Sequence, residues 1–308
     1  MIQLAANWST ALEKLLRKIN PPLDYLKMPL EREARLTLNA ARALRPVLLH
    51  GWGGFYRTGM LEIPQPGMLM ELVKASATPY LSVHLDVQPE DFETSVSREM
   101  TLERVVKSVN NLRELTGLEV MLENVAHYAW SERPDFVTDP EFIAKCLELS
   151  GAGFLLDLAH ARVSAHHRGE EVRDYLNALP LERIKEMHVS GPRLEADGLR
   201  DRHLPLSELD YMLLEEVIAK APNLKVLTLE YGGISDTGKT SDGREIRIPR
   251  NDPSALLEQL GRLDTIRKRA SGVLRKAPTL PAGWHLDKRF NLPPAEELSR
   301  SSIKAMGY

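Results

Sequence analysis

The chain has 308 residues, of which 43% are hydrophobic and 27% are charged, as is typical of soluble globular proteins. Its formal net charge of -3 gives no global basic field, which argues against a nucleic-acid partner without excluding a local basic groove. The only cysteine is Cys146, which excludes an intramolecular disulfide and fits a reducing cytoplasm.

Eight short apolar runs have the character of β-strands. Most of them are rich in Val, Ile and Leu and almost continuously apolar, which is typical of strands that are covered on both faces. In chain order they span residues 2–8, 24–29, 45–51, 79–86, 118–124, 153–160, 183–191 and 225–233.

The segments between these runs have the apolar spacing of helices. In residues 101–117 apolar side chains recur at intervals of three and four, and Gly117 stands where a C-terminal glycine cap belongs. The same kind of spacing occurs in residues 31–43, 139–149, 207–221 and 253–270. Ser207 and Asp252 are candidate N-caps, and Pro253 after Asp252 suits the first position of a helix.

Eight strand-and-helix units predict an α/β protein with a (β/α)8 TIM barrel. An open doubly wound sheet would give the same alternation of elements. The barrel is favoured because the count closes at eight and because no glycine-rich dinucleotide turn follows the first strand. The pattern stops near Pro278. We therefore predict a barrel domain over residues 1–277 and a C-terminal extension over 278–308 that packs on the barrel or contacts a partner protein.

Imidazoles and carboxylates stand at the carboxyl ends of six of the eight runs. These residues are His50, His84, Glu123, Asp157 with His160, His188 and Glu230, and Asp201 and His203 add a further pair in the loop after the seventh run. In a parallel barrel the carboxyl ends of all strands meet at one mouth, where catalytic groups gather. Asp201 and His203 would face the same side if their segment is extended.

This set predicts a site for two or three divalent metal ions about 3.5–4 Å apart, bridged by carboxylates. Imidazole and carboxylate groups suit iron, zinc and manganese. Without cations, four acids and five imidazoles would crowd one dry cavity, at a cost of several kcal/mol for each buried charge. Each residue alone could be structural, so the prediction depends on their repetition at one topological position. Flanking residues that could support the ligands or contact substrate are Asn124, Arg202, Trp52 and Tyr128.

The order of these residues resembles the three-metal site of endonuclease IV-type enzymes, in the xylose isomerase-like barrel superfamily. The surrounding motifs LENVAHY, LLDLAHARVSAHHRG and YLNALPLERIKEMHVSG, followed by DRHLP, resemble a second branch. That branch is the multinuclear non-heme iron-dependent oxidative enzymes, long catalogued as uncharacterised barrels, which modify ribosomally made peptides, often at cysteine. The resemblance runs from about residue 45 to 233. The chain departs from that branch at His160, where asparagine is common, at Gly191-Pro192-Arg193 and at Gly232-Gly233.

The resemblance implies an enzyme that holds two or three ions, with iron favoured over zinc or manganese, and oxidises a peptide or small-molecule substrate with dioxygen. Three other readings stay open. The first is an endonuclease IV-like phosphodiesterase, for which phosphate contacts could come from Arg57, Arg168, Arg193, Arg200 and Arg202. The others are a sugar isomerase or epimerase and a non-enzymatic scaffold with structural metals.

The sequence predicts a cytoplasmic protein with no membrane partner. No apolar stretch approaches the ~18 residues of a membrane span, and the first residues lack the layout of a secretory signal. Cys146 lies on an apolar helix face, so we expect it in the core rather than at a reactive site. His127, His166, His167 and His285 are left outside the site, with His166 and His167 expected in an exposed loop.

Overall fold

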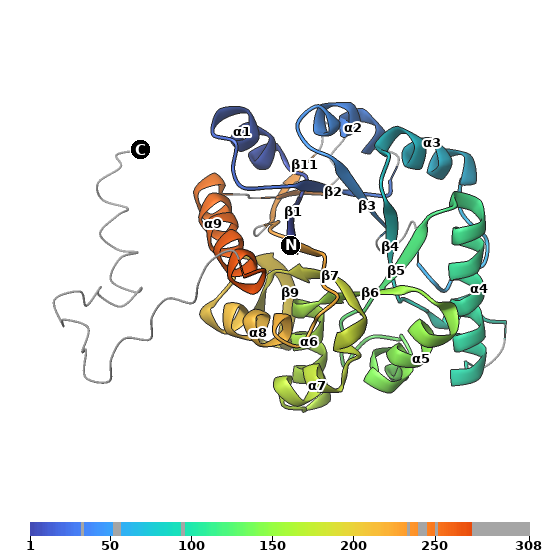
Figure 1. Cartoon of the computed structure of the whole chain (residues 1–308). Helices are drawn as coiled ribbons and strands as arrows, with labels where there is room; N and C mark the ends of the chain where they lie inside the picture. The colour runs from blue at the N-terminus through green and yellow to red at the C-terminus, as the bar shows by residue number, and fades with distance from the viewer. Residues whose placement is uncertain are drawn as a thin grey trace, which may run out of the picture. The chain divides into compact units, whose positions relative to one another are not determined.

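A closed parallel barrel forms the centre of the molecule. The computed structural model describes residues 1–31, 34–51, 57–93, 96–232, 235–239, 245–249 and 252–272. Its strands close in the order β1-β10-β7-β6-β5-β4-β3-β2, and helices surround them (Figure 1). The barrel strands are β1 (Gln3–Asn7), β2 (Tyr25–Pro29), β3 (Val47–Gly51), β4 (Tyr80–His84), β5 (Glu119–Glu123), β6 (Gly153–Asp157), β7 (Ile184–Val189) and β10 (Val226–Leu229). The predicted (β/α)8 barrel is confirmed.

The helices follow the strands around the barrel. They are α1 (Thr10–Lys18), α2 (Ala34–Arg42), α3 (Pro66–Ser76), α4 (Arg98–Thr116), α5 (Pro140–Ser150), α6 (Leu158–Arg168), α7 (Val172–Ala178), α8 (Glu208–Ile218) and α9 (Pro253–Ala270), with short 3-10 helices at Pro89–Asp91, Asp135–Thr138 and Leu181–Arg183. The predicted caps are confirmed. Ser207 and Asp252 each accept a backbone N–H bond at a helix start, and Gly117, at φ 69°, closes α4.

Several predicted strands end earlier than expected, among them 225–233, which stops at Leu229, and 153–160. The run 153–160 is a strand only as far as Asp157, because the Asp157 carboxylate accepts a bond from the His160 backbone N–H at 2.7 Å and so caps α6. His160 therefore lies in the first turn of a helix. The histidines His166 and His167, expected in a loop, lie in the last turn of the same helix.

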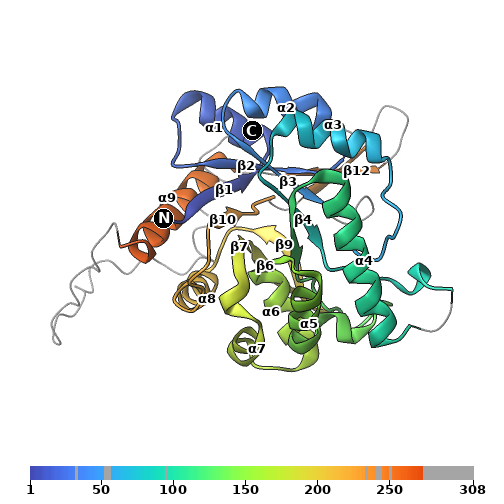
Figure 2. The same ribbon diagram turned by 45° about the vertical axis from the view of Figure 1, so that its right-hand side comes forward.

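Two antiparallel hairpins add to the barrel. One consists of β8 (Gly191–Glu195) and β9 (Gly198–Leu204), and the other of β11 (Ser235–Lys239) and β12 (Glu245–Pro249). The segment with Asp201 and His203 was predicted as a loop, but it is strand β9. This strand packs beside α6 (Figure 2), and the His167 Nε2 donates to the Leu199 carbonyl at 2.9 Å. The hairpin is thereby held against the barrel.

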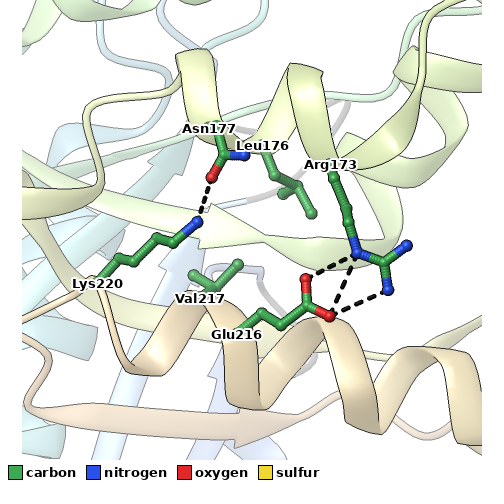
Figure 3. A pocket seen from close by; sticks show the side chains of 6 residues that line it. All are labelled: Arg173, Leu176, Asn177, Glu216, Val217 and Lys220. Carbon is green, nitrogen blue, oxygen red and sulfur yellow. Dashed lines mark hydrogen bonds and ion pairs between the residues drawn. The ribbon is translucent and has the colours of Figure 1, made fainter.

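The outer helices are joined by polar contacts as well as by apolar packing. Between α7 and α8, Arg173 pairs with Glu216 at 2.9 Å and Lys220 donates to Asn177 at 2.6 Å, over the apolar side chain of Leu176 (Figure 3). The hollow between them has a volume of about 10 Å³, enough for one water molecule. It is a helix contact and not a ligand site.

The inside of the barrel is layered. An apolar floor, defined here as Ala5, Leu48, Tyr80, Met121, Leu155 and Val226, is buried. A second layer holds the buried ion pair of Lys27 and Glu186, whose N–O distances are 2.8 Å. Cys146 is fully buried in the surrounding core, as predicted.

The described residues lie within one compact unit, Met1–Leu274. None of the helices in this described part is both long and apolar enough to cross a membrane. The predicted extension 278–308, together with Trp52 and His285, lies outside the described residues.

Candidate metal centre

Nine side chains converge at the carboxyl ends of the barrel strands. His50, His84, Glu123, Asp157 and His188 stand on β3, β4, β5, β6 and β7, Glu230 follows β10, His160 belongs to α6, and Asp201 and His203 belong to β9. Strand register explains part of this convergence, because His84 pairs with Glu123 and Asp157 pairs with His188 across neighbouring strands. The structure thus brings together all nine residues that the sequence singled out.

Glu123 lies at the middle of the cluster. Its Oε2 is 3.1 Å from the Nε2 of His50 and 3.3 Å from the Nε2 of His84. Its Oε1 is 3.3 Å from the Nδ1 of His188 and 3.6 Å from the Nδ1 of His160. One carboxylate therefore contacts four imidazoles, and Glu123 could hold a metal ion together with several of them.

The β9 residues complete the other side of the cluster. The Asp201 Oδ2 is 2.9 Å from the Nε2 of His203 and 3.5 Å from the Nε2 of His160. Glu230 connects the two sides, since its Oε1 is 3.2 Å from the Nδ1 of His188 and its Oε2 is 3.8 Å from the Nε2 of His203. Asp201 and His203 do face the same way, although His203 has a φ of 49° rather than an extended backbone.

The buried polar atoms of the centre fit a cation. Within the described part of the chain, both oxygens of Glu123, the Oδ2 of Asp157 and both ring nitrogens of His188 are buried without a hydrogen-bond partner. Such atoms are costly unless a ligand satisfies them. Ligand atoms in each of three groups lie within 4.8 Å of one another: His50, His188 and Glu230; His50, His84 and Glu123; and Glu123, Asp157, His188 and Glu230. The donor set suits divalent iron, zinc or manganese.

One ring nitrogen in each of two histidines already has a hydrogen-bond partner, and in His160 it is the same Nδ1 that lies 3.6 Å from Glu123. The Nδ1 of His160 donates to the backbone carbonyl of Asn124 at 2.8 Å. The Nδ1 of His50 lies 3.0 Å from the Ser82 hydroxyl, which itself donates to the Leu49 carbonyl and so accepts from the imidazole. In both rings Nε2 is left facing the centre, as in metal sites whose ligands are oriented by outer partners.

Charge is unevenly distributed over the carboxylates of the cluster. Burial raises the pKa of Asp157 to about 7, helped by the charges of Glu123, Asp201 and Glu230 and opposed by His160. Burial also raises the pKa of Glu230, but the charge of His188, whose Nδ1 is 3.2 Å away, outweighs this effect and brings the pKa to about 2. The acids therefore need positive charge nearby, which protonated imidazoles or metal ions can supply.

Of the four flanking residues, two lie at the centre. The Asn124 side chain bonds both the backbone N–H and the carbonyl of Asp157, at 2.8 and 3.0 Å. The Tyr128 hydroxyl accepts from the Asp201 N–H at 3.3 Å. Arg202 instead pairs with Glu195 along the hairpin, at 2.7 and 2.8 Å. Trp52, the fourth, is among the residues not described.

Two supporting residues were missed by the sequence reasoning. Asn7 donates to the Glu230 Oε1 at 3.2 Å, and Ser82 bonds His50 as described above. The available signal was period-two alternation, because Ser82 lies two positions before His84 on β4 and so points to the same side of the strand. Asn7 is the last residue of β1, the same topological position as the candidate ligands.

An aromatic rim lies beside the centre. Tyr128 and Trp130 are stacked with centroids 5.1 Å apart, His167 meets Trp130 edge-on at 5.1 Å, and the Arg200 guanidinium lies 4.5 Å from the Trp130 centroid. An open groove of about 680 Å³ adjoins this rim. It is lined by His127, Pro134, Asp135, Phe136, Asp139, His167, Arg168 and Glu170.

Comparisons with known proteins identify relatives of this chain. A family model described as RiPP precursor modification enzyme MbnB/TglH/ChrH matches residues 28–232. A UPF0276 protein of Anaeromyxobacter sp. is 28% identical over 206 residues, which is 60% of this chain and 70% of that protein. A UPF0276 protein of Acaryochloris marina is 28% identical over 178 residues, 54% of this chain and 62% of that protein.

Solved structures agree on the fold. Endonuclease IV from Thermus thermophilus superposes with a TM-score of 0.53 at 17% identity, covering 87% of this chain and 99% of that one. At this identity the likeness concerns the barrel fold alone. The family match spans most of the barrel and includes all nine converging residues, from His50 to Glu230. The chain therefore belongs to the MbnB/TglH/ChrH family of RiPP precursor modification enzymes and is a metal-dependent TIM-barrel enzyme.

Proposed function

We propose that this protein holds two or three iron ions at the barrel mouth and uses dioxygen to oxidise a peptide substrate. The observation that carries the proposal is the set of buried ligand atoms around Glu123 that have no hydrogen-bond partner in the described part of the chain. The family of this chain modifies peptide precursors. A small-molecule substrate and zinc or manganese as the metal are the alternatives. We place the reaction in the cytoplasm.

The chain's own groups would divide the work. The ligands would be His50, His84, Glu123, Asp157, His160, His188, Asp201, His203 and Glu230. When bound, the ions would supply redox equivalents and open coordination positions for substrate and dioxygen. Ligation requires neutral imidazoles and ionised carboxylates. Against the effect of burial, the neighbouring carboxylates raise the pKa of His160, His188 and His203, so metal binding would release protons from the cluster.

We infer that a substrate reaches the centre from the β9 side. The His203 side chain is 38% exposed, whereas those of Glu123 and His188 are fully buried. A substrate would therefore approach past His203 and the stacked Tyr128 and Trp130. The apolar layers on the barrel side exclude water from the inner ions, which strengthens electrostatic interactions there.

The decisive experiment is anaerobic reconstitution with ferrous iron, followed by metal analysis and Mössbauer spectroscopy. We expect more than one iron per chain, and oxygen consumption with a cysteine-containing peptide encoded beside this gene. Glu123→Ala should lose both. Arg173→Ala, in the ion pair between α7 and α8, is the matched control and should retain them. The proposal would be contradicted if the protein bound zinc but no iron, and consumed no oxygen with any peptide encoded beside its gene.

The phosphodiesterase reading gains no support from the arginines it would need. Arg57 pairs with Asp91, Arg168 with Asp139 and Glu170, and Arg200 with Asp197. Arg193 lies 3.7 Å from Glu195, which also pairs with Arg202. Guanidinium groups that are already paired with carboxylates are poor phosphate contacts unless those pairs break. Cleavage of abasic-site DNA by the zinc- or manganese-loaded protein would reverse this preference.

A further inference from the structure

Glu186 is a buried carboxylate that faces the centre without belonging to it. It lies two residues before His188 on β7, so both side chains point into the barrel. Its Oε1 accepts from Lys27 at 2.8 Å and from the Thr228 hydroxyl at 2.6 Å. Its Oε2 accepts from Lys27 at 2.8 Å and from the Tyr80 hydroxyl at 2.8 Å. These four bonds leave Glu186 poorly suited to ligate a metal itself.

The His188 ring lies between this layer and the centre. Its Nδ1 is 3.3 Å from Glu123 and 3.2 Å from Glu230, whereas its Nε2 is 3.3 Å from the Glu186 Oε1. These are close contacts between nitrogen and oxygen, and none of them is aligned as a hydrogen bond in the structure. The two nitrogens therefore face opposite layers of the barrel. The ring is fully buried, so no solvent can serve in place of either neighbour.

We propose that Glu186, which is paired with Lys27, is a positioning residue for His188: with a metal on Nδ1, the Nε2–H group would donate to the Glu186 Oε1, 3.3 Å away. This inference rests on the proposed metal function. It gives His188 the outer partner that Ser82 supplies to His50, with the roles of the two nitrogens exchanged. His188 thus binds through Nδ1, whereas His50 binds through Nε2.

Lys27 explains how the Glu186 carboxylate can lie buried directly below the metal centre. The centre already holds four acids, and a further buried negative charge below them would repel those acids and disfavour folding. Lys27 reaches Glu186 from β2 and cancels its charge inside the barrel, where neither side chain is more than 1% exposed. The pair adds an acceptor for His188 without adding net charge.

The test uses zinc as a diamagnetic divalent probe and measures its affinity by competition with a chromophoric chelator. Glu186→Gln keeps the size of the side chain but loses its charge, and should weaken zinc binding about 10–100-fold, as outer-partner changes do. Tyr80→Phe is the matched control, because it removes one bond from the far oxygen, Oε2. It should leave the affinity within about threefold. Equal affinity in Glu186→Gln and wild type would overturn the inference.

A second measurement needs no variant. In the zinc-loaded wild-type protein, long-range nitrogen–proton NMR should show His188 with a protonated Nε2 and a metal-bound Nδ1. A metal-bound Nε2 would overturn the inference even if zinc binds tightly. A wild-type protein that binds no divalent metal would overturn this inference and the proposed function together, whereas loss of the Glu186 effect alone would leave the proposed function standing.

Discussion

The barrel contains two buried charged layers that lie one above the other and differ in how their polar atoms are satisfied. In the lower layer, both oxygens of Glu186 have partners. In the upper layer, both oxygens of Glu123 have none among the described residues. The first layer is complete as folded. The second is complete only with a ligand. Burial alone thus does not mark a functional site; buried groups that the protein itself leaves unsatisfied do.

The largest expected effect is in the lower layer. Lys27→Met should destabilise the protein by about 3–5 kcal/mol, because it leaves Glu186 buried without its cation. Urea unfolding measures the loss. The double variant Lys27→Met, Glu186→Leu removes both charges and should recover most of it. If Lys27→Met unfolded at the same urea concentration as the wild type, the lower layer would not depend on its ion pair, and the contrast between the layers would be wrong.

Metal addition should act on the upper layer. Zinc at about 100 times its dissociation constant should stabilise the wild-type protein by about 2.7 kcal/mol, and removal with a chelator should reverse the gain. Glu123→Gln should lose most of this metal-dependent stabilisation, since the amide replaces a carboxylate that contacts four imidazoles. Equal stabilisation of variant and wild type by zinc would place the metal elsewhere.

A smaller effect is expected at the edge of the upper layer. Asn7→Ala removes the bond to the Glu230 Oε1 and should weaken zinc binding by about 1 kcal/mol, or about fivefold. The chelator competition described above resolves such a change. The free energy of unfolding without metal should change less than in Lys27→Met, and the reverse order would contradict the assignment of Asn7 to the centre.

The smallest expected effect is at Cys146, outside both layers. Burial raises the pKa of its thiol to about 12, so the folded protein should not react with iodoacetamide at about pH 8. Because the thiol ionises near its ordinary pKa of ~8.5 only when unfolded, this term lowers stability as pH rises above that value. The rate at which iodoacetamide labels Cys146 then measures how often the whole protein unfolds. This rate should be higher in Lys27→Met than in Asn7→Ala.

The sequence predicted the barrel well because its strands are apolar on both faces, a pattern that survives without tertiary information. The α9 bounds were predictable from Asp252 and Pro253, whose local chemistry starts a helix by itself. The β8–β9 hairpin could not be predicted, because β9 is half-buried along its whole length and shows no alternation of buried and exposed residues. Its pairing with β8 and its packing on α6 are tertiary.

The nine converging residues were predictable for a simpler reason. Topology alone brings strand ends together, so His50 and Glu123 could be placed without knowing any contact. The residues of the lower layer could not be placed in this way. Lys27 and Glu186 are separated by 159 residues, and each is an ordinary charged residue in its own segment. Only the closed barrel shows that the two side chains meet.

The Asp157 side chain has two tasks. One oxygen caps α6, while the other has no hydrogen-bond partner among the residues that the structure describes. In its last turn the same helix carries His167, which donates a hydrogen bond to the β8–β9 hairpin. That hairpin supplies Asp201 and His203. Helix α6, eleven residues long, therefore joins the ligands on the barrel strands to the two ligands on β9. Altering that aspartate would disturb both halves at once, so its phenotype should exceed the loss of a single ligand.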